Sequence, residues 1–232
     1  MAEMTFEAFD ALLRSRHSCR AFQDEALPRA DIEAILKAAQ RVPSWCNAQP
    51  WKVEITGKPE TDRLRDALFA HAHEAPYAPE IDWPERYSGV HQWRRKTCGL
   101  QLYDSVGITR GDRAASGAQM YENFRLFGAP HMALITAPTE LGPYAYLDCG
   151  GFVTGFTLAA QARGVGSIPQ AAVAAYAPFL RDWFGIGEDR VILCGIAFGR
   201  PAPEAPINKF RTERAPLTEW VNWHGETEED AT

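Results

Sequence analysis

The sequence predicts a single α/β domain. Its 232 residues are 46% hydrophobic, which suits one large core. Two continuous apolar runs of strand length, at 131–137 and 190–199, predict sheet strands that are covered on both faces. Stretches with apolar residues at helical spacing flank these runs. No internal repeat or low-complexity segment interrupts the pattern.

The first third of the chain alternates predicted helices with one strand. Thr5 can cap a first helix whose apolar residues fall at helical spacing. Residues 27–40 carry a second amphipathic stripe. Residues 51–57 alternate like a strand and end on a glycine. Residues 58–72 then predict a third helix with a proline in its first turn.

Two helices are predicted in the later part of the chain. Residues 146–164 predict a long buried helix that ends at Gly164, and residues 176–187 predict a short amphipathic one. Three glycines inside the long helix lower its helix propensity and suggest close packing against another helix: Gly150, Gly151 and Gly155.

Two stretches fit this plan less easily. Residues 76–113 contain no clear strand and are rich in proline and aromatic residues at their start, so they predict an irregular excursion with a helix at 93–106. The excursion is expected to cover a substrate. Residues 200–223 follow the last strand as a proline-rich tail, which we expect to lie against a second subunit. Four aromatic residues of the excursion could line a substrate pocket or pack in the core: Trp83, Tyr87, Trp93 and Tyr103.

Composition and spacing exclude several functional classes. A net charge of −6 with no long basic stripe argues against nucleic-acid binding. The N-terminus lacks the apolar core of a secretion signal, and no run reaches the roughly 18 apolar residues of a membrane helix. Five scattered cysteines without a CxxC pair indicate a reducing compartment. The histidines show no metal-ligand spacing. We therefore expect a cytoplasmic protein without metal.

Basic side chains gather near both ends of the sequence. Guanidinium and hydroxyl groups are the donors that proteins place around a phosphate monoester. Neither a P-loop nor a GxGxxG turn is present as another phosphate site. A solvated basic patch remains the alternative interpretation. The candidate residues are Arg14, Arg16, Ser18 and Arg20 near the N-terminus, and Arg211 and Arg214 near the C-terminus.

Six motifs occur in the order and spacing typical of one flavoprotein family. They are "RHSCRAF", "PSWCNAQPW", "FGAPH", "GVGSIPQ", "GIAFGRP" and "NKFRTERAPL". Over residues 10–220 the sequence resembles the FMN-dependent nitroreductase family. The resemblance implies that residues 1–232 form one α+β, nitroreductase-like domain. Its central mixed, mostly antiparallel sheet would be wrapped by helices, with an extended C-terminal arm at 200–223. It also implies a homodimer with FMN at the subunit interface.

The resemblance assigns the basic residues to the cofactor. Arg16 and Arg214 correspond to the arginines that hold the FMN phosphate and ribityl chain. His17 and Ser18 correspond to contacts beside them. Arg211 is a further candidate, whose alternative role is an ion pair with its neighbour Glu213 or with other nearby groups.

Two further groups correspond to contacts with the flavin ring. Arg20 falls at the basic position near the pyrimidine edge, where Arg125 and Asn123 are additional candidates. One segment corresponds to the backbone amides that face flavin N5: Pro169, Gln170, Ala171 and Ala172. Ala171 and Ala172 stand where many family members have glutamate and glycine, so only a backbone contact carries over.

The "PSWCNAQPW" loop corresponds to a contact with the flavin of the other subunit. Pro43, Ser44 and Asn47 would reach across the interface, while Gln49 leads into the sheet. The alternative is a rigid turn stabilised by proline and asparagine.

The implied chemistry resides on the flavin rather than on a protein acid, base or nucleophile. NADH or NADPH would transfer hydride to N5 and leave before a nitroaromatic or quinone enters the same slot, giving ping-pong kinetics. Arg20 and Arg125 would stabilise negative charge on the ring. Two alternatives remain: other flavin chemistry on the same scaffold (dehalogenation, flavin fragmentation or azoline oxidation), or a flavin-binding protein without turnover.

Overall fold

The central feature of the molecule is a four-stranded antiparallel sheet. The computed structural model describes residues 5–225, so residues 1–4 and 226–232 of the predicted domain lie outside it. The strands have the order β1-β2-β4-β3, and each neighbouring pair is antiparallel. This confirms the α+β class. The strands are β1 (Lys52–Thr56), β2 (His131–Pro138), β3 (Gly166–Gln170) and β4 (Arg190–Gly199).

Strand β2 shows why both faces of the sheet are apolar. Successive side chains of a strand point to opposite faces. Met132 and Leu134 therefore pack into one core cluster, while Ala133 and Ile135 pack into the other. The continuous apolar run read from the sequence reflects this burial on both sides.

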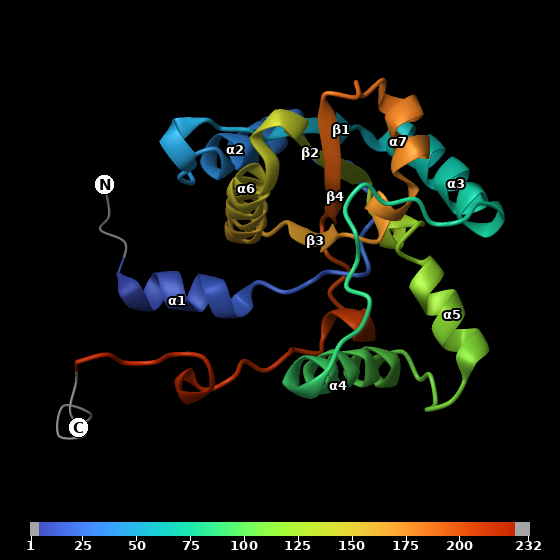
Figure 1. Cartoon of the computed structure of the whole chain (residues 1–232). Coiled ribbons are helices and arrows are strands. Elements are labelled where there is room, and N and C mark those ends of the chain that lie inside the picture. Colours follow the sequence, from blue (N-terminus) through green and yellow to red (C-terminus); the bar gives the residue numbers. More distant parts are fainter. Residues whose placement is uncertain (1–4, 226–232) are drawn as a thin grey trace.

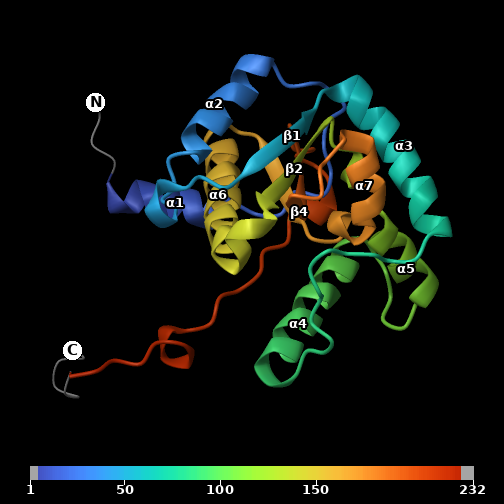
Figure 2. The ribbon, with the colours of Figure 1, turned by 45° about the horizontal axis from the view of Figure 1, so that its top comes forward.

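Helices cover each face of the sheet (Figures 1 and 2). Helices α2 (Arg29–Ala39) and α6 (Gly142–Ala162) lie on one face, and their apolar residues contribute to the same core cluster as Ile135. Helices α3 (Lys58–Glu74) and α7 (Ala177–Phe184) cover the other face. All four were predicted, although α6 begins earlier than expected because Pro143 opens its first turn.

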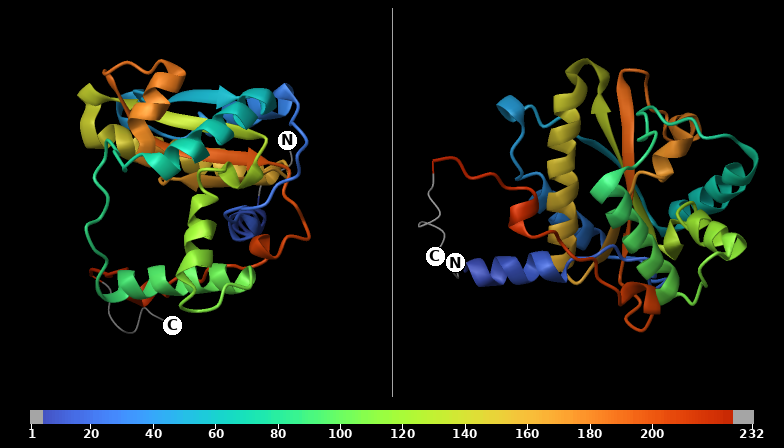
Figure 3. Two further views of the ribbon diagram at one scale, coloured as in Figure 1. Left: turned by 90° about the vertical axis from the view of Figure 1, so that its right-hand side faces the viewer. Right: turned by 60° about the horizontal axis from the view of Figure 1, so that its bottom comes forward.

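Three helices lie outside the layers formed by the sheet and the four helices that cover it. Helix α1 (Phe6–Ser15) begins at Thr5, whose hydroxyl accepts the Ala8 amide at 3.2 Å, as the sequence predicts. Helices α4 (Gly89–Ser105) and α5 (Arg113–Tyr121) project away from the sheet, as the left view of Figure 3 shows. Helix α4 supplies 17 residues of the predicted excursion, and the irregular residues lie before it, at 75–88, and after it, at 106–112.

The irregular segment 75–88 is anchored at its base. The Ala78 amide donates to the Ala175 carbonyl at 2.7 Å. The Glu80 carboxylate accepts the Ile192 amide at 2.7 Å and pairs with Arg181 of α7. These contacts fix the start of the connection that leads to α4.

Strand β3 was missed by the sequence analysis. Its five residues, "GSIPQ", contain a glycine and a proline, which normally argue against a strand. Pro169 is tolerated because β3 is the edge strand of the sheet. Gly164, just before it, has a φ of +68° and ends α6 as predicted.

The C-terminal stretch has two parts. Residues 200–208 pack on their own chain, where the Ala202 amide donates to the Ala21 carbonyl at 2.9 Å. Beyond them the arm runs away from the sheet, as Figure 2 shows. Within residues 5–225 the arm takes part in two ion pairs: Lys209 pairs with Glu204 at 3.2 Å, and Glu219 pairs with Arg94 of α4 at 2.6 Å.

Within residues 5–225, no helix has the length and apolar character needed to cross a membrane. The same residues contain no group of three His, Cys, Asp or Glu side chains arranged to hold a metal ion.

Candidate functional site

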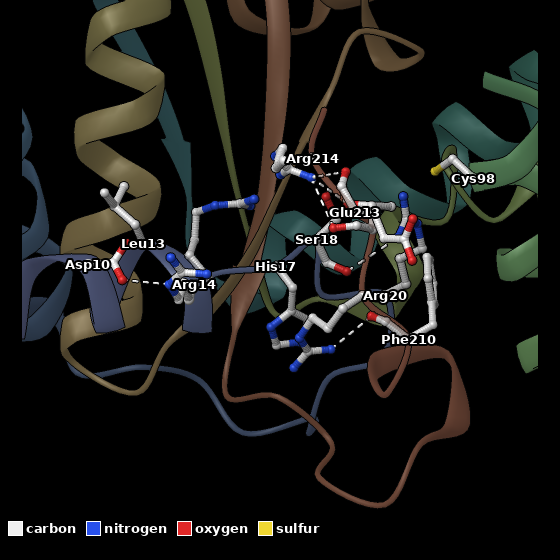
Figure 4. Close-up of a pocket in the computed structure, with 13 residues that line it drawn as sticks. Asp10, Leu13, Arg14, His17, Ser18, Arg20, Cys98, Phe210, Glu213 and Arg214 are labelled. Atoms are coloured by element: carbon white, nitrogen blue, oxygen red, sulfur yellow. Dashed lines mark hydrogen bonds and ion pairs between the residues drawn. The ribbon is translucent and has the colours of Figure 1, made fainter. Parts of the chain in front are cut away.

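A cleft of about 980 Å³ opens between the end of α1, helix α4 and the arm (Figure 4). It brings together side chains from the two ends of the chain. The lining residues are Asp10, Leu13, Arg14, Arg16, His17, Ser18, Arg20, Cys98, Phe210, Arg211, Thr212, Glu213 and Arg214.

Backbone contacts hold the N-terminal wall of the cleft in place. After α1 the chain is extended, and Ser18 forms a parallel bridge with Ser167 of β3. The Cys19 amide donates to the Ser167 carbonyl at 3.1 Å. Gly166 permits this approach, because a Cβ there would lie 2.8 Å from the Cys19 sulfur.

Asn208 ties the two ends of the chain together. Its Oδ1 accepts the Arg20 amide at 2.8 Å, and its Nδ2 donates to the Ala21 carbonyl at 2.8 Å. The residues that follow Asn208 are therefore carried directly to the side of Arg20. No sequence signal identifies this role, because the hydrogen bonds join residues almost 190 positions apart.

The cleft contains positive charge that its own carboxylates do not neutralise. Arg14 pairs with Asp10 at 2.6 Å. Four other arginines have no carboxylate within 4.0 Å in the part of the chain that the structure describes. They are Arg16, Arg20, Arg211 and Arg214.

The two C-terminal arginines bond to the backbone instead. Arg211 donates to the carbonyls of Asn208 and Phe210 at 2.7 and 2.9 Å, so the predicted alternative of an ion pair with Glu213 is not formed. Arg214 donates to the carbonyls of Thr212 and Glu213 at 3.2 and 3.1 Å and to the Thr212 hydroxyl at 2.9 Å. These bonds orient both guanidinium groups without cancelling their charge.

Burial and charge repulsion both act on Arg16. Partial burial lowers the pKa of Arg16, and the nearby charge of Arg214 lowers that pKa further. Burial also lowers the pKa of Arg20. An anion in the cleft would relieve this repulsion and replace lost hydration.

His17 offers an unused hydrogen-bonding atom. Its Nδ1 lies 3.1 Å from the Ser15 carbonyl, which assigns the ring proton to that nitrogen. Its Nε2 is buried and has no partner in the described chain. Burial lowers the pKa of His17, so the neutral ring is favoured. A ligand donor beside Nε2 would satisfy this atom.

Arg20 occupies an aromatic environment. Its guanidinium carbon lies 5.9 Å from the Phe127 ring centre and 5.7 Å from the Phe210 ring centre. Such contacts stabilise the cation through the negative ring faces. Phe210 forms part of this wall, a role that the sequence analysis did not assign to it.

Asn123 and Gln170 hold each other. The buried Gln170 amide donates to the Asn123 carbonyl and Oδ1 at 3.0 and 3.2 Å. Arg125 lies over Phe69 at 4.7 Å and does not line the cleft. Arg125 thus packs on Phe69, whereas Arg20 packs on Phe127 and Phe210.

The segment predicted to face N5 continues directly from β3. Pro169 lies within the strand, and the carbonyls of Ala171 and Ala172 accept the amides of Ala174 and Ala175. A short 3₁₀ turn thereby fixes the direction in which this segment leaves the sheet.

The 43–49 loop lies away from the cleft. Pro43 precedes Ser44, whose hydroxyl accepts the Gln49 amide at 3.0 Å, and Gln49 Nε2 donates to the Asn47 carbonyl at 3.4 Å. The loop contacts the first turns of α6, where Trp45 packs against Tyr144. The chain continues from the other end of this helix into β3, whose Ser167 bridges Ser18 of the cleft lining. A helix of 21 residues is about 30 Å long, so one chain does not bring the two groups together.

Comparisons with known proteins agree with the fold. A model of the nitroreductase family matches residues 13–200. The chain is 36% identical over 217 residues to nitroreductase NfnB of Mycolicibacterium smegmatis, covering 92% of this chain and 91% of that protein. It is 31% identical over 216 residues to 4-nitrobenzoate reductase of Pseudomonas putida, covering 92% and 94%. The solved structure of the FMN-dependent nitroreductase NfnB of Mycobacterium smegmatis, in complex with NADPH, superposes with a TM-score of 0.89. That structure shares 33% identity and covers 94% of this chain and 98% of the other.

Proposed function

The chain belongs to the nitroreductase family, and from this premise we propose that it is an FMN-dependent enzyme that oxidises NADH or NADPH and reduces aromatic nitro compounds. Its relatives include NfnB and a 4-nitrobenzoate reductase, and the NfnB structure contains NADPH. The observation that carries the proposal is the cleft, where four guanidinium groups from both chain ends have no carboxylate partner among residues 5–225.

The phosphate of FMN fits this charge distribution. Arg16, Arg211 and Arg214 would donate charge-assisted hydrogen bonds to it, with the Ser18 hydroxyl beside them. The unpartnered Nε2 of His17 would accept a hydroxyl proton from the ribityl chain. Within the described residues, the first contact uses guanidinium charge that no carboxylate pairs with, and the second uses a buried atom without a hydrogen-bond partner.

When bound, the flavin supplies the two-electron hydride chemistry. Arg20 would stand at the pyrimidine edge, where its charge stabilises electron density gained by the ring. Asn123 and Gln170 would act indirectly, by holding the 169–172 segment against the turn that follows α5. We assign no protein acid, base or nucleophile.

We further infer that the reductant and the oxidant use one slot in turn. Ping-pong kinetics would follow, because the nicotinamide must leave before the aromatic oxidant enters. Quinones are flat acceptors of the same size and would be alternative oxidants. The exposed rings of Trp83, Tyr87 and Trp93 support the interpretation of the 76–113 excursion as a substrate cover.

A homodimer would bring the 43–49 loop and the cleft to one flavin. On one chain they lie near opposite ends of α6, so the Pro43, Ser44 and Asn47 loop can serve only a cleft on another copy. Large apolar side chains are exposed on the segments that this arrangement would cover: Phe6, Phe9, Leu13, Trp45, Leu147, Leu217, Trp220 and Trp223.

Anaerobic mixing tests the proposed function. The purified protein loaded with FMN should lose its oxidised-flavin absorbance when NADH or NADPH is added, and should regain it when a nitroarene is added. Persisting absorbance would favour a binding protein without turnover. Bleaching without recovery by nitroarenes or quinones would favour the other flavin chemistries. A protein that takes up no FMN would contradict the proposal as a whole.

A further inference from the structure

One face of α6 follows the chain from the end of α2 into the 43–49 loop. Tyr144, Asp148, Gly151 and Gly155 are spaced by four, three and four residues, so they lie on one side of the helix. We call these four residues the loop-facing stripe. Its C-terminal half meets the end of α2, and its N-terminal half meets the loop.

The glycines of the stripe let the chain approach α6 closely. A Cβ at Gly155 would lie 2.7 Å from Val42 Cγ1 and 3.2 Å from the Ala39 carbonyl oxygen. A Cβ at Gly151 would lie 3.9 Å from Val42. The backbone that leads into the loop is therefore seated directly on the helix.

Asp148 and Tyr144 then contact the loop itself. Both carboxylate oxygens of Asp148 accept the Trp45 backbone amide, at 3.1 and 3.2 Å. The Tyr144 ring packs edge-on against the Trp45 ring, with centroids 4.3 Å apart. A hydrogen bond to an ionised carboxylate is stronger than one between neutral groups.

The residues after Trp45 adopt a conformation that needs such support. Cys46, Asn47 and Gln49 have φ values of 48°, 57° and 48°. This left-handed region is unfavourable for residues with a Cβ, and it persists only where the surrounding structure enforces it. All three residues are exposed, so little packing from their own side chains enforces it.

We propose that Asp148 is a positioning residue for the flavin-facing loop. Its carboxylate holds the Trp45 amide and thereby maintains the left-handed conformations of Cys46, Asn47 and Gln49. These conformations set the direction in which Asn47 and Gln49 meet the ring of a flavin on a partner chain. The inference rests on the proposed function, and Asp148 itself contacts no reacting atom.

Hydrogen exchange without flavin tests the first step. Replacing Asp148→Ala should lower the protection of the Trp45 amide on the order of tenfold or more, because it loses a charged acceptor. The Asp148→Asn variant keeps an oxygen acceptor and should retain most of the protection. Asp182→Ala, an exposed aspartate on α7, is the matched control and should leave Trp45 unchanged.

Kinetics and spectra of the flavin-loaded protein test the second step. Asp148→Ala should retain FMN, because the arginine cleft lies elsewhere, but its flavin absorption band should shift. Its kcat should fall about ten- to a hundredfold from the misplaced loop, with little change in the KM for NADPH. Asp148→Asn should restore both the spectrum and kcat.

Three outcomes would overturn the inference: wild-type protection of Trp45 in Asp148→Ala, a wild-type spectrum and kcat despite lost protection, or a uniform loss of protection across the sheet. The last would mean that Asp148 stabilises the whole fold. A wild-type protein that binds no FMN would instead end the proposed function, while the exchange experiment would still decide whether Asp148 holds the loop.

Discussion

At the scale of single residues, Arg16 shows that the cleft contains positive charge without a carboxylate partner among the described residues. Burial and the neighbouring Arg214 both lower its pKa, and no carboxylate of the described residues pairs with it. We expect Arg16→Ala to weaken FMN binding by about 2–3 kcal/mol, roughly thirty- to 150-fold, as for a lost charge-assisted bond. Fluorescence titration of the flavin-free protein measures this change.

Arg14 provides the matched control for that titration. It lines the same cleft but already pairs with Asp10. Arg14→Ala should therefore change the Kd for FMN by less than about fivefold, as for an exposed ion pair. Equal losses of FMN affinity in Arg16→Ala and Arg14→Ala would contradict a specific phosphate contact at Arg16.

His131 makes the fold sensitive to acid. This side chain is 3% exposed; its Nε2 accepts the Leu27 amide at 2.8 Å, and its Nδ1 lies 3.1 Å from the Thr56 carbonyl. Burial lowers its pKa, so below pH about 6.5 the unfolded chain binds more protons than the folded one. Stability should fall as the pH drops from there through the pKa of the folded state, by at most about 1.4 kcal/mol per pH unit.

Urea unfolding at pH 7.5, 6.5 and 5.5, roughly spanning the ordinary histidine pKa, measures this effect. His131→Gln should reduce the pH dependence, and His91→Gln, at an exposed position on α4, should leave it unchanged. Some pH dependence of stability should persist in His131→Gln, because burial also lowers the pKa of His17. If the stability of His131→Gln fell with pH as steeply as that of the wild-type protein, His131 would not be the source of the acid sensitivity.

At the scale of elements, the packing of α2 on α6 depends on one glycine. Gly155→Ala should destabilise the protein by about 1–3 kcal/mol, because its methyl group would overlap Val42 and crowd the Ala39 carbonyl. Gly150 lies in the same helix, and a Cβ there would meet no atom within 4 Å. The Gly150→Ala variant should therefore stabilise the protein by up to about 1 kcal/mol. Thermal unfolding measures both, and the same sign for the two variants would contradict the packing argument.

At the scale of the whole molecule, the arm divides at Arg214. Residues up to Arg214 build the cleft, whereas Leu217, Trp220 and Trp223 beyond it are 56%, 64% and 68% exposed. Removing residues 215–232 should therefore give a folded monomer that binds FMN more weakly, because the apolar part of the arm is expected to bury itself on a second copy.

Sedimentation and flavin titration of the truncated chain measure this outcome. Removing only residues 226–232 is the control and should change neither property. A truncated protein that stays dimeric and fully loaded with flavin would show that the arm is not needed for assembly.

Much of the fold could be predicted because its signals are local. The helices at 29–39 and 58–74 and the apolar strands at 131–138 and 190–199 repeat their pattern within one element. Strand β3 carries no such pattern, since its pairing with β4 at the sheet edge is decided by tertiary structure. The left-handed conformations of Cys46, Asn47 and Gln49 could not be predicted either, because none of these residues is a glycine.

The sequence by itself determined the arginine, serine and histidine side chains that suit a phosphate, and the motif order that identifies the family. Only the tertiary structure decided which of them meet: Asn208 brings the arm to Arg20, while Arg125 packs on Phe69 and does not line the cleft. The physical reason is the distance in sequence between the residues that interact. Helical periodicity and caps involve residues a few positions apart, whereas a site assembled from distant segments depends on backbone hydrogen bonds and packing formed when the chain folds.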